Sequence, residues 1–116
     1  MTIQNTEQWQ SFVKNSLDFR PQDGVYRISR DMFTKPELFE LEMELIFEKV
    51  WIYACHESEI ANNNDFVTVT IGRQPIIVSR DGNGQLHALV NACEHRGATL
   101  TRVSKGNQST FTCPFH

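Results

Sequence analysis

Apolar residues in the first part of the chain recur at helical spacing. After Thr6, four of them lie three or four positions apart, and this spacing predicts a short amphipathic helix. They are Trp9, Phe12, Val13 and Leu17. Because only one face of such a helix is apolar, we expect that face to pack on another element of the fold.

A second and longer helix is predicted after the turn-rich segment 20–24. Thr34 and Glu37 have the spacing of a capping box, and Pro36 is tolerated in the first helical turn, where its missing N–H costs no hydrogen bond. A wide apolar face follows, which we interpret as the face of a core helix. Its residues are Leu38, Phe39, Leu41, Met43, Leu45, Ile46 and Val50.

From Asn62 onward the apolar pattern changes to that of β-strands. The expected strands are 66–71, 75–80, 86–90 and 110–112. Turn residues separate them, most clearly at 81–84, where the sequence DGNG predicts a hairpin. We therefore expect an α+β fold in which N-terminal helices pack on a small antiparallel sheet. We place the helical segment at residues 1–54 and the sheet domain at residues 55–116.

Length, composition and charge limit the function. At 116 residues, with a hydrophobic fraction of 40% and a charged fraction of 22%, the chain reads as one modest globular domain. The formal charge of -3 gives no basic face for nucleic acid. There is no secretory signal and no apolar run of membrane-spanning length, so we expect a cytoplasmic protein without membrane contact. In that reducing compartment, the three cysteines read as ligands or thiols rather than as disulfides.

Two short clusters of cysteine and histidine carry the clearest chemical signal. The first is Cys93-x-His95 and the second is Cys113-x-x-His116. Thiolate and imidazole ligands favour zinc, copper or an iron–sulfur cluster. Common zinc fingers pair two cysteines and then two histidines, whereas here each limb supplies one of each. A Rieske [2Fe–2S] cluster uses that division, so Cys93 and Cys113 are predicted to share one iron and His95 and His116 the other.

This ligand set affects the reduction potential of the cluster. Neutral imidazoles in place of two thiolates raise the reduction potential from about -400 mV toward roughly -150 to +300 mV. We therefore predict a relay for single electrons. Gly97 suits a tight ligand loop, and Pro114 would stiffen the second loop.

The remaining cysteine and histidines favour structural readings. Cys55 and His56 are adjacent on an extended segment, so their side chains are expected on opposite faces, as a core thiol and a partly exposed imidazole. His87 is expected at the surface or in a cross-strand pair. We predict no catalytic residue in the chain itself.

The residues CEHRG at 93–97 and CPFH at 113–116 resemble the Rieske signature of aromatic-ring-hydroxylating dioxygenases, in their large (α) subunit. The resemblance extends through residues 37–60, 62–82 and 89–100. Within this family the chain is most similar to the benzoate and anthranilate 1,2-dioxygenase branch, and most of all to the anthranilate enzyme.

The resemblance implies a terminal oxygenase component. In this family an NADH-dependent, FAD-containing reductase supplies electrons to the Rieske cluster, which passes them to a non-haem Fe(II) where O2 dihydroxylates an aromatic acid. For anthranilate the product is catechol. The implied partners are small β subunits, other α subunits and the reductase.

The family's Fe(II) site and substrate pocket lie in a C-terminal domain that these residues do not include. We therefore expect an N-terminal fragment that is inactive as an oxygenase alone. Benzoate or toluate remain alternative substrates. A stand-alone Rieske electron carrier and a structural zinc module remain alternative functions.

Overall fold

The computed structural model describes residues 6–115, and the chain divides into two compact units, Met1–Glu42 and Met43–His116. Small antiparallel sheets and a few helices confirm the α+β class. The expected domain boundary between residues 54 and 55 stays a prediction, as does the packing of the N-terminal helices on the sheet.

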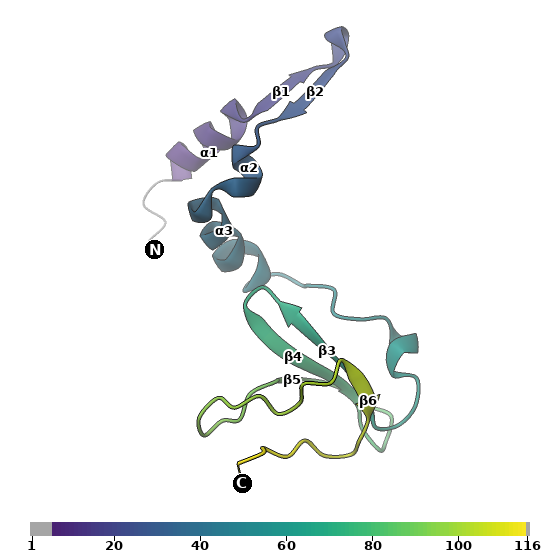
Figure 1. Cartoon of the computed structure of the whole chain (residues 1–116). Coiled ribbons are helices and arrows are strands. Elements are labelled where there is room, and N and C mark those ends of the chain that lie inside the picture. Colours follow the sequence, from purple (N-terminus) through teal and green to yellow (C-terminus); the bar gives the residue numbers. More distant parts are fainter. Residues whose placement is uncertain (1–5, 116) are drawn as a thin grey trace. The chain divides into compact units, whose positions relative to one another are not determined.

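The first unit begins with the predicted amphipathic helix and then forms a hairpin that the periodicity did not predict. The elements are α1 (Thr6–Asn15), β1 (Leu17–Arg20), η1 (Pro21–Asp23) and β2 (Val25–Ile28) (Figure 1). Gly24 ends the turn at a φ of 67°, a left-handed conformation that glycine adopts without strain. Across the hairpin, Phe19 and Tyr26 pack edge to face with ring centroids 4.9 Å apart. Leu17 therefore belongs to a strand and not to the first helix.

The predicted capping box at Thr34 is wrong. The chain forms two separate helices here, α2 (Asp31–Thr34) and α3 (Pro36–Glu42), with Lys35 extended between them at a ψ of 119°. A proline disfavours helical geometry in the residue before it, which explains the break ahead of Pro36. Thr34 is the last residue of α2, where its hydroxyl donates back to the carbonyl of Arg30 at 3.3 Å.

The second unit opens with the π-helix η2 (Met43–Phe47), where a longer α-helix was expected. The N–H of Glu48 donates to the carbonyl of Met43 at 2.9 Å, a spacing of five residues. The β3–β4 turn lies directly against η2. A Cβ at Gly72 would lie 3.0 Å from the Cβ of Phe47 and 3.1 Å from the sulfur of Met43, and the φ of Gly72 is 59°. Glycine is required there on both counts.

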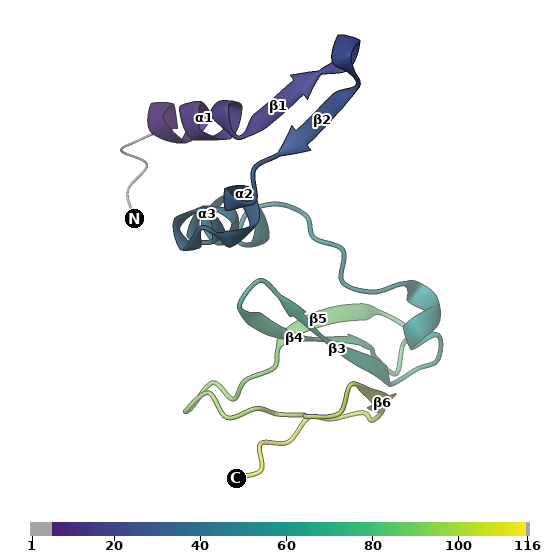
Figure 2. The ribbon, with the colours of Figure 1, turned by 45° about the horizontal axis from the view of Figure 1, so that its top comes forward.

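A four-stranded antiparallel sheet forms the body of the second unit (Figures 1 and 2). Its strands are β3 (Asp65–Ile71), β4 (Gln74–Arg80), β5 (Leu86–Val90) and β6 (Lys105–Asn107), in the order β5-β4-β3-β6. The first three lie where the sequence predicted strands. The strand expected at 110–112 is absent from the described residues, and the edge strand is β6 instead. Its sequence, Lys-Gly-Asn, has little intrinsic preference for a strand, so pairing with β3 creates it.

A small core lies beneath this sheet. Ile60 ends the short 3-10 helix η3 (Glu57–Ile60), and it packs with Val67 of β3 and Val78 of β4. Ile77 is fully buried, at 0% exposure. Among residues 6–115, no helix combines the length and the apolar character that a transmembrane span requires.

Candidate metal centre

The first ligand loop leaves the end of β5 and closes on itself within a few residues. The N–H of Cys93 donates to the carbonyl of Ala98 at 2.8 Å, and the N–H of Gly97 donates to the carbonyl of Cys93 at 2.7 Å. Gly97 has a φ of 69°, which confirms the tight turn predicted at this glycine. The two hydrogen bonds form a compact loop with Cys93 at its base and His95 near its tip.

The second ligand segment is held by an aromatic contact. Phe111 packs edge to face on Phe66 of β3, with ring centroids 5.1 Å apart and an interplanar angle of 87°. Phe66 is 2% exposed, so its ring is a fixed support for the segment that follows β6. Cys113, two residues after Phe111, is 9% exposed. The contact brings Cys113 back toward the first loop, although 19 residues lie between Cys93 and Cys113 in the sequence.

The two cysteine side chains meet. The Cys113 thiol donates a hydrogen bond to the sulfur of Cys93. The pKa of Cys93 lies below its usual value, chiefly because the backbone N–H of His95 donates to its sulfur, with further support from Cys113 and the N–H of Arg96. The Glu94 carboxylate acts in the opposite direction. Backbone donors aimed at one sulfur favour the thiolate, which is the form that binds a metal.

A pocket of about 660 Å³ opens at these two sulfurs. Its lining residues are Cys93, His95, Arg96, Ala98, Cys113 and Phe115. Three of the four predicted ligands therefore line one cavity, and the fourth, His116, lies outside the described residues. Within residues 6–115, no group of three or more His, Cys, Asp or Glu side chains is close enough to hold a single metal ion. The structure brings the two cysteines together and places His95 on the wall of the same pocket.

This donor set suits an iron–sulfur cluster better than a single ion. Two adjacent thiols, one of them with a lowered pKa, match the cysteine half of a Rieske cluster, and an imidazole on the same wall matches the histidine half. A cluster with two irons spreads its ligands over a wider space than one tetrahedral ion does, so its ligands need not converge on one point. The residues present fit a [2Fe–2S] group.

Cys55 and His56 take the structural roles expected of them. Cys55 is half-buried and packs against the core around Ile60, and burial raises the pKa of its thiol. His56 is exposed and caps η3, because its Nδ1 accepts from the N–H of Ser58 at 3.2 Å and its own N–H donates to Glu59 at 2.9 Å. Neither residue lines the pocket at Cys93 and Cys113.

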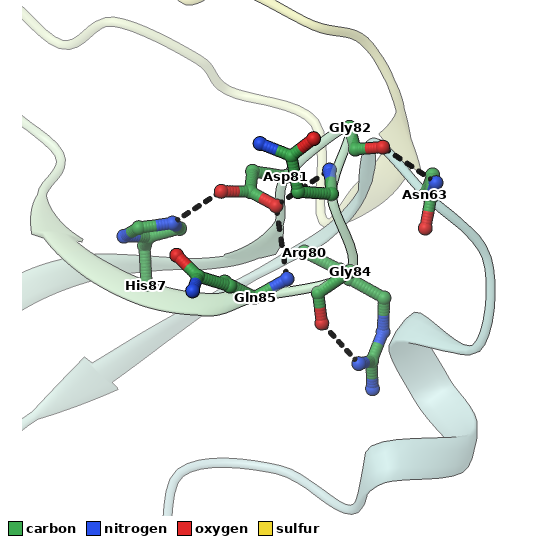
Figure 3. A network of polar contacts seen from close by, with 8 residues as sticks. Asn63, Arg80, Asp81, Gly82, Gly84, Gln85 and His87 are labelled. Atoms are coloured by element: carbon green, nitrogen blue, oxygen red, sulfur yellow. Dashed lines mark hydrogen bonds and ion pairs between the residues drawn. The ribbon is translucent and has the colours of Figure 1, made fainter.

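His87 also lies apart from the metal centre. Figure 3 shows its Nε2 facing a carboxylate oxygen of Asp81 across the β4–β5 hairpin, at 2.9 Å. The other oxygen of Asp81 accepts from the N–H groups of Asn83 and Gln85, at 2.8 and 2.9 Å. These contacts lower the pKa of Asp81, with the His87 hydrogen bond as the largest cause. His87 therefore stabilises a turn, as a cross-strand partner.

Comparison with known families agrees with this geometry. The model of the Rieske [2Fe-2S] domain matches residues 50–116. The chain belongs to the Rieske [2Fe-2S] domain family. The match begins shortly after η2 and takes in both ligand loops, so the pocket at Cys93 and Cys113 lies within the Rieske domain.

Relatives of this Rieske domain are large subunits of oxygenases. The chain is 82% identical over 116 residues to the anthranilate 1,2-dioxygenase large subunit of Acinetobacter baylyi, covering 100% of this chain and 25% of that protein. It is 50% identical to the toluate 1,2-dioxygenase subunit alpha of Pseudomonas putida, covering 90% and 23%. The chain thus spans about a quarter of the length of these relatives.

A solved structure shares the fold. The naphthalene 1,2-dioxygenase from Rhodococcus sp. bound to indole superposes with a TM-score of 0.77 at 32% identity, over 96% of this chain and 25% of that chain. The resemblance noted from the two ligand motifs is thereby confirmed at the level of fold and family.

Three supporting residues escaped the sequence reasoning. Phe66 and Phe111 hold the second ligand segment, and Asn91 joins the two ends of the first loop. The signal for Asn91 was present, because an asparagine directly after a strand often bonds nearby backbone through its side chain. Nothing in the sequence pairs Phe66 with Phe111, because their contact depends on the register of β6 against β3.

Proposed function

We propose that this chain carries the Rieske cluster of the large subunit of an aromatic-ring-hydroxylating dioxygenase. The proposed ligands are Cys93, His95, Cys113 and His116. The main support is the 82% identity to an anthranilate 1,2-dioxygenase large subunit along the whole chain. The hydrogen-bonded pair Cys93 and Cys113, with His95 in the same pocket, supports the assignment of the ligands.

The residues around the pocket prepare it for the cluster. A bound Rieske cluster accepts and passes on single electrons. The N–H groups of His95 and Arg96 point at the sulfur of Cys93, so they stabilise negative charge on that ligand. The side chain of Phe115 lines the same pocket and adds apolar surface near the sulfurs. Such hydrogen bonds and apolar surroundings tune the potential of an iron–sulfur site.

The proposed reaction is the conversion of anthranilate, O2, NADH and two protons to catechol, carbon dioxide, ammonia and NAD+. Electrons would come from NADH through an FAD-containing reductase, and a non-haem Fe(II) outside these 116 residues would activate O2. Small β subunits and further α subunits are the proposed partners. The substrate rests on identity, which is 82% to the anthranilate enzyme and 50% to the toluate enzyme. Benzoate or toluate is the second candidate substrate.

Metal analysis and electron paramagnetic resonance (EPR) test the proposed ligands. The reconstituted protein should contain two irons and two sulfides per chain and show the EPR signal of a reduced Rieske cluster. The variants C93S and C113S should lose this signal. The matched control C55S should keep it, because Cys55 packs in the core and lines no part of the pocket. Zinc without iron in the wild-type protein would overturn the proposal.

Turnover tests the substrate. The complete oxygenase, supplied with reductase and NADH, should release catechol and ammonia from anthranilate with O2 uptake coupled to NADH oxidation. Benzoate and toluate should react more slowly in parallel assays. Faster turnover of either would reassign the substrate while leaving the cluster assignment intact.

A further inference from the structure

Asn91 closes the first ligand loop with both ends of its side-chain amide. Its Nδ2 donates to the carbonyl of Thr101 at 2.8 Å, and its Oδ1 accepts from the N–H of Thr101 at 3.0 Å. The residue is 6% exposed, so these bonds form largely away from water. The amide thus pairs with Thr101 as a strand residue would.

The same residue joins the loop to the sheet. The backbone N–H of Asn91 donates to the carbonyl of Pro75 at 2.8 Å, next to the start of the β4–β5 ladder. The loop 92–100 therefore leaves and returns at one fixed point beside the sheet. Cys93 and His95 lie on this loop.

We propose that Asn91 is a positioning residue for the metal centre. It fixes the two ends of loop 92–100, so Cys93 and His95 are held in place before the cluster binds. The inference rests on the proposed Rieske function, since it assigns Asn91 a role in that site. Asn91 acts through the backbone of Thr101, to which its side-chain amide is hydrogen-bonded.

Of the asparagine, aspartate and serine side chains, only the asparagine amide can both donate to the Thr101 carbonyl and accept from the Thr101 N–H. A carboxylate of the same size can accept from the Thr101 N–H, but it cannot donate to the Thr101 carbonyl and would repel it. A serine is too short to reach both atoms. In either variant a partly buried backbone group loses its partner, which is the costly way to break a hydrogen bond. The ends of the loop would then separate more readily, and the ligands would sample a wider range of positions.

The test compares N91D and N91S with the control N83D, in the protein with and without its cluster. Asn83 lies in the β4–β5 turn at the other end of β5, so N83D adds the same charge outside the loop. In the cluster-free protein, hydrogen exchange of the Thr101 amide should be about tenfold faster or more in N91S, which loses the acceptor of this N–H. The increase should be smaller in N91D, whose carboxylate still accepts from the Thr101 N–H but repels its carbonyl. N83D should exchange at the wild-type rate.

The loaded protein supplies the second readout. N91D and N91S should hold less iron and sulfide per chain, and the remaining cluster should show a shifted potential and a broadened EPR signal. A merely structural role would lower stability while leaving the potential and the EPR signal of the folded protein unchanged. Wild-type values for potential, EPR signal and Thr101 exchange in a folded Asn91 variant would overturn the inference.

Two further outcomes are distinguishable. A wild-type protein that binds no [2Fe–2S] cluster would refute the proposed function, while the exchange of Thr101 would still test the pairing. If both Asn91 variants unfold, hydrogen exchange in the wild-type protein tests the inference instead. Its Thr101 amide should exchange far more slowly than the exposed amides of the same loop, and equal rates would overturn the inference.

Discussion

The substitution G106A should destabilise the Rieske unit, because Gly106 faces a buried ring. Gly106 of β6 lies opposite Phe66 of β3. A Cβ at position 106 would lie 2.8 Å from Cε1 and 3.1 Å from Cζ of Phe66. These are closer than ordinary carbon contacts, which lie at about 3.5–4.0 Å. Phe66 is 2% exposed and packs on Phe111, so its ring has no open space into which it can turn.

The magnitude follows from two opposing effects. Overpacking a buried site costs about 1–3 kcal/mol, because neighbouring side chains leave their preferred positions. Alanine in place of a strand glycine recovers about 0.5–1 kcal/mol by lowering the entropy of the unfolded chain. We expect a net loss of about 0.5–2 kcal/mol in the free energy of unfolding. Because Phe111 lies two residues before Cys113, a displaced Phe66 should also lower the cluster content.

Denaturant unfolding followed by circular dichroism measures the effect. The matched control is G82A, since the nearest atom to a Cβ at Gly82 is the Asn64 Oδ1 at 4.0 Å. G82A should be neutral or slightly stabilising. The double variant F66L/G106A should be more stable than the sum of the single effects predicts, because the smaller side chain makes room. Wild-type stability of G106A, or an equal loss in G82A, would refute the reasoning.

Three further predictions concern the same unit. I77A should lower the free energy of unfolding by about 2–5 kcal/mol in denaturant titrations, since Ile77 is fully buried, whereas V103A at an exposed position should change it little. The pKa of Asp65 is lowered chiefly by the hydrogen bond from the amide of Asn107, so the Asp65 carboxylate stabilises the fold above the ordinary carboxyl pKa, and this stabilisation is lost as the pH falls through the lower folded value. D65N should therefore weaken the dependence of the free energy of unfolding on pH in the acid range. An unchanged pH dependence in D65N would contradict this prediction. H56A should remove the cap of η3 and cost about 0.5–1 kcal/mol in thermal unfolding, with no change in cluster content.

Local patterns predicted much of the second unit. Segment 66–71 alternates apolar and polar residues, segment 75–80 carries the apolar run Ile-Ile-Val, and segment 86–90 follows the hairpin turn. Each became a strand within a residue of the expected bounds. The turn at 81–84 was equally predictable, because the Asp81 side chain accepts hydrogen bonds from backbone N–H groups of its own turn. These elements depend on contacts between near neighbours, so a short stretch of sequence contains the information.

The sequence-based predictions failed where the local structure depends on residues far away in the sequence, or where a helix is interrupted. The strand β6 exists because Lys105–Asn107 pairs with β3, a partner far away in the sequence. The segment expected as a strand at 110–112 instead lays Phe111 on Phe66. The long helix expected after Thr34 begins only at Pro36 and changes to a π-helix at Met43, where the Gly72 turn lies close.

The sequence by itself predicted the ligands and the chemistry of the metal centre. The types and order of Cys93, His95, Cys113 and His116 point to a Rieske cluster whatever the surrounding fold, because ligand preference is a property of the side chains. Only the tertiary structure decided how the two ligand loops meet. The meeting depends on the Asn91 amide at Thr101 and the Phe66 ring at Phe111, and each contact joins residues from separate segments of the chain that only the folded structure brings together.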